Sequence, residues 1–269
     1  MEKLPYQFLE REVAKLAYVD IGEGTPLLLV HGLGLDLRMW TAQMNYFQSK
    51  YRVIAYDVRG FGKSAFGGDP QAHLAIEDLK ALVDHLALEK IYLVGLSMGG
   101  NIVISFAAHY PELVEKLVVV DGDIQGFDNY TLEFKGLLKS VFEMGKSKGP
   151  LAAKLAWARN ELLQPYQLSE ATRLLEVMLK EYSGLHLTDP KLLPGTNPPS
   201  LTMLDKVQSP TLIVVGEKDI VDFHRMADQA VSQIAQARKV EIPACGHMPP
   251  LERPPEFNKV LTEFLNETI

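Results

Sequence analysis

Short apolar runs alternate along much of the chain with segments whose apolar residues recur at helical spacing. Most of these runs are followed by glycine or acidic residues, which is typical of a buried strand that ends in a loop. They predict strands over residues 13–21, 26–30, 52–57, 91–94, 117–120, 211–216 and 239–242. Because strands alternate with helices, we expect a mostly parallel sheet that is covered on both faces.

The pattern changes from about residue 122 to residue 200, where apolar residues follow helical spacing and no buried strand is predicted. Three helices are expected there, around residues 134–142, 151–162 and 175–182, and Ser169 is a candidate N-cap of the third. Their apolar faces need a partner to bury against. We therefore expect a core domain of residues 1–121 and 201–269, and a helical cap or lid of residues 122–200.

One predicted strand ends in the sequence Gly-Leu-Ser-Met-Gly, residues 95–99, and a helical pattern follows. In a strand–turn–helix context this G-x-S-x-G pattern predicts a sharp turn that lifts Ser97 onto a strained tip. Small residues at 95, 99 and 100 let the chain reverse and let the helix pack close to its strand. Unpartnered N–H groups at the start of the helix lie beside the serine. The pattern therefore indicates that Ser97 is a nucleophile.

Asp219 and His247 each follow a predicted strand, as Ser97 does. Ligands of such a sheet bind outside the carboxyl ends of its strands, so we expect all three residues to face one crevice. A serine hydroxyl needs a base within hydrogen-bond reach, and the base needs a group that fixes its tautomer. The order Ser, Asp, His is the one that this architecture uses. Asp121 and Asp123 follow an earlier strand and stay open as alternative acids, although residues 216–219 form the loop better able to reach His247.

An oxyanion hole needs two backbone N–H donors aimed at the developing charge. Met98 follows the nucleophile at a helix N-terminus and is expected to supply one donor. Leu33, in the loop of residues 31–34, is expected to supply the other. His31 is expected to shape this loop through a hydrogen bond. The candidate substrate-binding residues are Gly32, Trp40, Gly122 and Ile124, and Trp157 is a weaker pocket candidate than Trp40.

The sequence resembles the α/β-hydrolase superfamily. The resemblance is carried by residues 31–34, 57–64, 95–100, 216–219 and 246–247. It implies an α/β-hydrolase fold with a mostly parallel eight-stranded sheet, helices on both faces and a helical cap inserted after the sixth strand. That is where residues 122–200 fall. It also implies the same Ser-Asp-His triad and a loop role for Asp57 and Arg59.

Within the superfamily, residues 32–40 and 95–100 are similar to enol-lactonases, small carboxylesterases and some acyl-homoserine lactonases. This similarity implies a cofactor-free serine hydrolase that cleaves carboxylic esters or lactones through an acyl-enzyme on Ser97. Haloalkane dehalogenases and epoxide hydrolases use an aspartate nucleophile, so Ser97 speaks against them. Carbon–carbon bond hydrolases and perhydrolases share the serine and stay open. So does a small-ligand receptor that retains the triad without turnover.

Length, net charge and composition limit the kinds of partner and the cellular setting that we expect. The length of 269 residues suits one large domain or a domain with an insertion, and the net charge of −7 argues against nucleic acid. No apolar run approaches the ~18 residues that cross a bilayer, so no membrane partner is expected. The first residues lack an apolar signal core and Cys245 is the single cysteine, which favours a cytoplasmic setting.

The expected hydrolysis needs no metal and no cofactor, and the histidines of the sequence show no metal-binding spacing. Cys245 is expected to pack as a small apolar residue. The apolar residues of the helical segment favour a small-molecule substrate with an apolar acyl part. The pattern does not indicate the acyl length or the oligomeric state.

Overall fold

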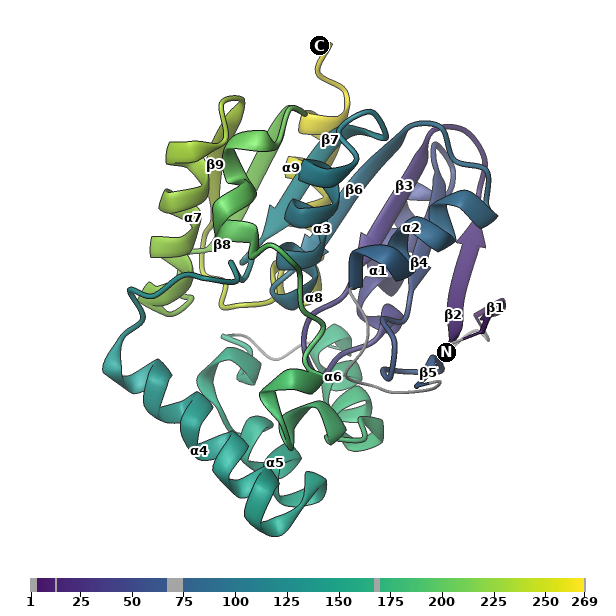
Figure 1. The fold of residues 1–269 in the computed structure, drawn as a ribbon. Coiled ribbons are helices and arrows are strands. Elements are labelled where there is room, and N and C mark those ends of the chain that lie inside the picture. Colours follow the sequence, from purple (N-terminus) through teal and green to yellow (C-terminus); the bar gives the residue numbers. More distant parts are fainter. Residues whose placement is uncertain (1–3, 13, 67–74, 167–169, 269) are drawn as a thin grey trace.

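A computed structural model of the chain describes residues 4–12, 14–66, 75–166 and 170–268. Its centre is a nine-stranded sheet, of which eight strands follow one continuous path (Figure 1). In spatial order these strands are β1 (Gln7–Arg11), β2 (Ala14–Ile21), β4 (Arg52–Tyr56), β3 (Pro26–Val30), β6 (Ile91–Leu96), β7 (Val114–Val120), β8 (Thr211–Gly216) and β9 (Ala237–Ile242). The ninth strand, β5 (Ala65–Phe66), pairs with β2 beside this path.

The sheet is mostly parallel, as the pattern predicts. Among the described strands, β2 pairs antiparallel with β1, β4 and the short β5. Every pairing along the path from β4 to β9 is parallel. The apolar runs form the central strands, and the side chains from Leu27 to Val30 are fully buried. The pattern misses β1 because all of its side chains are exposed or half-buried, so it lacks a buried-strand signal. Val13 and the candidate cap Ser169 lie outside the described residues.

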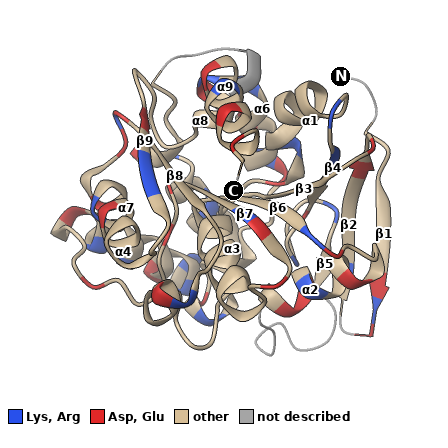
Figure 2. Cartoon of the chain, turned by 90° about the horizontal axis from the view of Figure 1, so that it is seen from above, with Lys and Arg blue, Asp and Glu red and all other residues tan. Residues whose placement is uncertain are grey.

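Helices cover both faces of the sheet (Figure 2). On one face lie α1 (Thr41–Phe47) and α9 (Pro254–Leu265), and on the other lie α2 (Ala75–His85), α3 (Met98–His109) and α7 (Val221–Gln233). A single turn, α8 (Pro249–Glu252), precedes α9. Basic and acidic residues are interspersed over the outer helices and strand edges in this view, so the net charge is not gathered on one element.

The chain between β7 and β8 is helical and lies beyond one end of the sheet (Figure 1). We call residues 122–200 the insertion. It contains α4 (Leu132–Lys148), α5 (Pro150–Trp157) and α6 (Glu170–Glu181), with short 3₁₀ turns between α5 and α6 and after α6. If β5 is set aside, β7 is the sixth strand along the chain, which is the expected point of insertion. No helix among the described residues is long and apolar enough to cross a membrane.

The second helix of the insertion ends earlier than predicted. The spacing predicts one helix through Leu162, whereas α5 ends at Trp157 and a 3₁₀ turn, Glu161–Leu163, follows. The side chain of Asn160 accepts a hydrogen bond from the backbone N–H of Leu162 at 2.8 Å. An asparagine that bonds its own backbone two residues ahead competes with a continuing helix. The chain therefore turns between Trp157 and Leu162.

Candidate active site

Ser97 lies between β6 and α3 with φ +53° and ψ −116°, in the region of backbone space that residues other than glycine rarely adopt. Its neighbours explain how the turn is held. A Cβ added to Gly95 would lie 2.3 Å from the carbonyl oxygen of Gly99, and a Cβ added to Gly99 would lie 2.4 Å from that of Val30. Only glycine allows these approaches. The strain at Ser97 is thus imposed by close packing around it, as expected for a nucleophile presented on a sharp turn.

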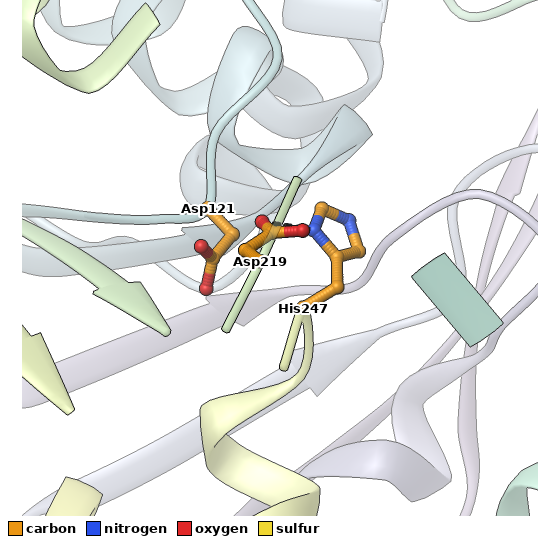
Figure 3. A group of neighbouring side chains, drawn as sticks. All are labelled: Asp121, Asp219 and His247. Atoms are coloured by element: carbon orange, nitrogen blue, oxygen red, sulfur yellow. Dashed lines mark hydrogen bonds and ion pairs between the residues drawn. The ribbon is translucent and has the colours of Figure 1, made fainter. Parts of the chain in front are cut away.

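His247 and Asp219 are joined by a hydrogen bond of 2.7 Å between Nδ1 and Oδ2 (Figure 3). Their loops follow β9 and β8 and pack so closely that a Cβ on Gly216 would lie 1.8 Å from the carbonyl oxygen of Gly246. The ring of Phe223 covers the imidazole at a centroid distance of 4.3 Å. Since a carboxylate only accepts, the Nδ1 position carries the proton, and Nε2 is left to act as a base.

Ser97 and His247 line one small cavity of about 10 Å³ at the carboxyl ends of the strands. No hydrogen bond joins the two side chains in the part of the chain that the structure describes; such bonds are often long in unliganded enzymes. The other lining residues are Gly32, Leu33, Leu35, Leu96, Trp157, Leu162, Leu163 and Met248. The serine and the histidine are therefore the polar side chains of an otherwise apolar cavity.

Asp121 follows β7, and Asp219 lies between it and His247 (Figure 3). Burial, and after it the charge of Asp219, raises the pKa of Asp121 well above its usual range. The carboxyl group also accepts a hydrogen bond from the N–H of Gly216 at 3.1 Å. Asp219, which lies between Asp121 and the imidazole, is thus the carboxyl group that bonds the histidine.

Asp123, the other alternative acid, faces Tyr130, whose hydroxyl donates to its Oδ1 at 3.4 Å. Burial raises its pKa. Of the three aspartates, the structure pairs Asp219 with His247. Asp121, Asp219 and His247 offer three possible metal ligands within 4.8 Å of one another. A metal ion held by Nδ1 would have to displace the proton that bridges His247 and Asp219, because a ligating nitrogen must be deprotonated.

The loop expected to form the oxyanion hole lies beside the nucleophile. A Cβ on Gly32 would lie 3.4 Å from the Cβ of Ser97. Met98 is the first residue of α3, where a backbone N–H has no intrahelical acceptor. The N–H of Leu33 makes no backbone–backbone hydrogen bond among the described residues. Both donors predicted from the sequence are thus placed near Ser97 without a competing backbone acceptor.

His31 shapes this loop, as the sequence predicts. Its Nε2 accepts from the N–H of Val58 at 2.9 Å, so Nδ1 is the donor in the 2.9 Å contact with the carbonyl oxygen of Gly32. Burial lowers the pKa of His31 to about 4, which keeps the ring neutral near pH 7. Asp57 braces the next part of the loop, because its carboxylate accepts from the N–H groups of Leu37 and Lys63 at 2.8 and 2.7 Å.

Of the four candidate substrate-binding residues, Gly32 lines the small cavity. Trp40 is fully buried and packs against Phe257, so it lies in the core and not among the lining residues. Gly122 packs against Gly100, where a Cβ would lie 2.6 Å from the Cα of Gly122. Ile124 is 1% exposed and also lies away from the cavity lining.

Three cavity-lining residues of the insertion face Ser97 in place of Trp40: Trp157, Leu162 and Leu163. The indole N–H of Trp157 donates to the carbonyl oxygen of Leu33 at 3.4 Å, so this residue also touches the oxyanion loop. The sequence names Trp157 only as the weaker candidate. The helix-breaking Asn160 is the sequence signal that could have indicated these residues, because a helix that ends there turns the following leucines back toward the sheet.

A larger cavity of about 800 Å³ lies on the other side of Leu35, which lines both cavities. Its cations are already engaged: Arg38 pairs with Asp36 and Glu181, and the Lys63 ammonium stands over the ring of Tyr6. Neither Ser97 nor His247 lines it. The small cavity is therefore the candidate active site. Cys245 is fully buried, and burial raises the pKa of its thiol, so it packs as expected.

Comparisons with known proteins show which family the chain belongs to. The family described as alpha/beta hydrolase fold matches residues 25–203. Epoxide hydrolase 3 of Mus musculus is 25% identical, over 95% of this chain and 75% of its own length. A 2-hydroxy-6-oxo-6-(2'-aminophenyl)hexa-2,4-dienoic acid hydrolase of Metapseudomonas resinovorans is 27% identical, over 98% of this chain and 93% of its own.

Similar solved structures are hydrolases too. A thermophilic esterase from Thermogutta terrifontis has a TM-score of 0.77 at 29% identity, over 96% of this chain and 98% of that one. Est816, described as an N-acyl homoserine lactone degrading enzyme, has a TM-score of 0.73 at 25% identity, covering 96% and 100%. The enol-lactonase from Burkholderia xenovorans LB400, at 22% identity, shares the fold with a TM-score of 0.78, covering 98% and 100%.

Proposed function

Because the chain belongs to the α/β-hydrolase family, we propose that it is a serine hydrolase that cleaves neutral carboxylic esters or lactones. The observation that carries the proposal is the buried His247–Asp219 hydrogen bond of 2.7 Å at the wall of the cavity that contains Ser97. A histidine held in one tautomer beside a strained serine is the arrangement that activates a hydroxyl.

In the proposed reaction the Ser97 hydroxyl attacks the substrate carbonyl while His247 Nε2 takes its proton. Asp219 holds the ring and stabilises its charged form, and the N–H groups of Leu33 and Met98 stabilise the oxyanion. Protonated His247 then gives its proton to the leaving alkoxide, which leaves an acyl group on Ser97. Water activated by His247 releases the acid. These steps require no metal and no cofactor.

The substrate is proposed to be neutral and to have an apolar acyl part. Apart from Ser97 and His247, the described residues that line the cavity are glycine, leucine, methionine and tryptophan. A carboxylate placed among them would be desolvated without a cation to pair with. This speaks against the kind of substrate named for the Metapseudomonas relative, because that substrate is a carboxylic acid. Epoxide hydrolysis is also disfavoured, since the nucleophile position holds a serine.

We further propose that the insertion is a cap that must move to admit substrate. A cavity of about 10 Å³ holds no more than one water, and the insertion contributes Trp157, Leu162 and Leu163 to it. Moving these three side chains away from Ser97 would create the space that an acyl group needs. The same movement would decide which acyl lengths fit.

Hydrolysis of p-nitrophenyl butyrate by wild type and by Ser97→Ala tests the function. We expect the substitution to lower kcat by a factor on the order of 10⁵. Ser105→Ala is the matched control, because Ser105 lies within α3, the helix that follows Ser97, is buried and lies outside the cavity. A panel of neutral esters, lactones including an acyl-homoserine lactone, and esters with a carboxylate on the acyl part then defines the substrate class. A folded wild type that turns over none of them would favour a receptor role.

A further inference from the structure

Glu252, at the end of α8, accepts three backbone hydrogen bonds although it is only 5% exposed. Its Oε1 accepts from the N–H of Met248 at 3.1 Å. Its Oε2 accepts from the N–H of Gly246 at 3.1 Å and from that of Tyr166 at 2.8 Å. Hydrogen bonds to a buried charged acceptor are stronger than neutral ones, and losing the acceptor leaves each donor unsatisfied.

Two of these three donors flank His247 directly in sequence. The carboxylate therefore brackets the peptide units on both sides of the proposed base. The approach is close, because a Cβ on Gly246 would lie 3.0 Å from Oε1 of Glu252. Asp219 fixes the imidazole through Nδ1, whereas Glu252 fixes the backbone from which the ring projects. The position of Nε2 relative to Ser97 depends on both.

The third donor, Tyr166, belongs to the insertion. It ends the segment of residues 157–166, which begins at Trp157 with the indole hydrogen bond to Leu33. Between these two attachments lie Leu162 and Leu163, which fill the cavity. One attachment thus reaches the oxyanion loop, and the other reaches the carboxyl group in α8 that also holds the histidine loop.

We propose that Glu252 is a positioning residue that holds His247 in register with Ser97 and fastens the insertion over the cavity through Tyr166. This inference rests on the proposed function. The same carboxylate then holds the insertion against the core and keeps the base in place. Loss of the Glu252 acceptor lowers kcat through His247, and loss of the Tyr166 donor alone raises KM through the insertion.

The first test is Glu252→Gln. A glutamine side chain has one acceptor oxygen and an NH₂ group, so in either orientation the N–H of Gly246 or that of Met248 faces a donor. Since small misplacements of catalytic groups cost up to about 100-fold, we expect kcat to fall by about 10- to 100-fold. Glu256→Gln is the matched control: Glu256 pairs with the side chain of Arg253 and is partly exposed, and its substitution should leave kcat within about twofold.

A spectroscopic measurement separates this inference from the proposed function. We expect the proton shared by His247 Nδ1 and Asp219 to give a strongly deshielded ¹H NMR signal, which is assigned by its loss in His247→Gln. We expect Glu252→Gln to shift or broaden this signal in the absence of substrate, whether or not the protein hydrolyses esters. Urea unfolding measures the folded fraction of each variant. An unchanged signal and kcat, or losses that match the unfolded fraction, would overturn the proposal.

The link to the insertion is tested by comparing Tyr166→Pro with Tyr166→Ala, because only the proline removes the backbone N–H. We expect Tyr166→Pro to raise KM by about three- to tenfold relative to Tyr166→Ala, with kcat and the shared-proton signal unchanged. Equal KM values in the two variants would show that Tyr166 does not fasten the insertion. Because both keep Glu252, they also test the proposal if Glu252→Gln does not fold.

Discussion

The two walls of the candidate active site are held in different ways. The core wall carries Ser97, His247 and Leu33 on loops that continue directly from sheet strands and are buried among close backbone contacts. The insertion wall carries Trp157, Leu162 and Leu163 on a segment that is hydrogen-bonded to the core at Leu33 and at Glu252.

Exposure follows the same division. The large exposed apolar side chains of the insertion include Leu132, Leu151 and Leu155, at 82%, 62% and 51%. The core strands contain fully buried leucine and valine. A region that leaves such side chains exposed opens at lower free energy than a fully buried sheet. In the proposed reaction, the core wall therefore keeps the chemistry constant, and the insertion wall sets access and acyl length.

Among the substitutions on the core wall considered next, we expect the largest loss of activity at Asp219. Replacing it with asparagine keeps the size of the side chain but removes the charge that stabilises protonated His247, and an amide no longer fixes its tautomer. We expect kcat to fall by about 10⁴ with KM little changed, measured by steady-state ester hydrolysis. Asp228→Asn is the control, since Asp228 pairs with Lys239 at the surface. Near wild-type activity in Asp219→Asn would return the acid role to Asp121 or Asp123.

The second core prediction concerns His31 and pH. Burial lowers its pKa from 6.5 to about 4, so below pH 6.5 the unfolded chain binds a proton that the folded chain does not. Stability from this group is therefore present above pH 6.5 and is lost as the pH falls toward 4. Between pH 7 and pH 5 the unfolding free energy of wild type should fall by about 2 kcal/mol more than that of His31→Gln.

Urea unfolding at the two pH values measures this difference. His85→Gln is the control, because His85 is an exposed histidine and its removal should leave the pH dependence as in wild type. If His31→Gln loses as much stability as wild type between pH 7 and pH 5, the buried neutral ring is not the source of the effect.

On the insertion wall, Leu163→Ala should change selectivity and leave the chemistry intact. Removing this side chain, which is 4% exposed, enlarges the cavity beside Ser97. We expect the ratio of kcat/KM for p-nitrophenyl octanoate to that for the butyrate to rise about tenfold. Leu155→Ala is the control on the exposed face of α5. An unchanged ratio would mean that acyl length is decided elsewhere.

Trp157→Phe should have the mildest effect. The phenyl ring keeps most of the apolar contact but cannot donate to the carbonyl oxygen of Leu33. A lost hydrogen bond of this kind costs about 0.5 to 1.5 kcal/mol, so we expect KM to rise about threefold with kcat unchanged. A fall in kcat instead would show that the indole also holds the oxyanion loop in its working position.

The sequence predicted the parallel sheet, its helical cover and the helical insertion, because buried strands and amphipathic helices leave local periodic patterns. It also predicted that Ser97, Asp219 and His247 lie at strand ends, and parallel strands bring such ends to one edge. Their catalytic roles stay a proposal. The choice between Trp40 and Trp157 went against the sequence-based preference, because composition and spacing do not reveal which tryptophan faces a cavity.

Sequence alone therefore determined where the reactive side chains stand along the sheet, since each follows from a strand and the turn after it. The tertiary structure alone decided what faces them: the leucines of residues 157–166, the small volume of the cavity, and the contacts of Glu252 with Gly246, Met248 and Tyr166. The physical reason is that local patterns encode which face of an element is buried. They do not encode which distant segment packs against it, and Tyr166 meets Glu252 across 86 residues of chain.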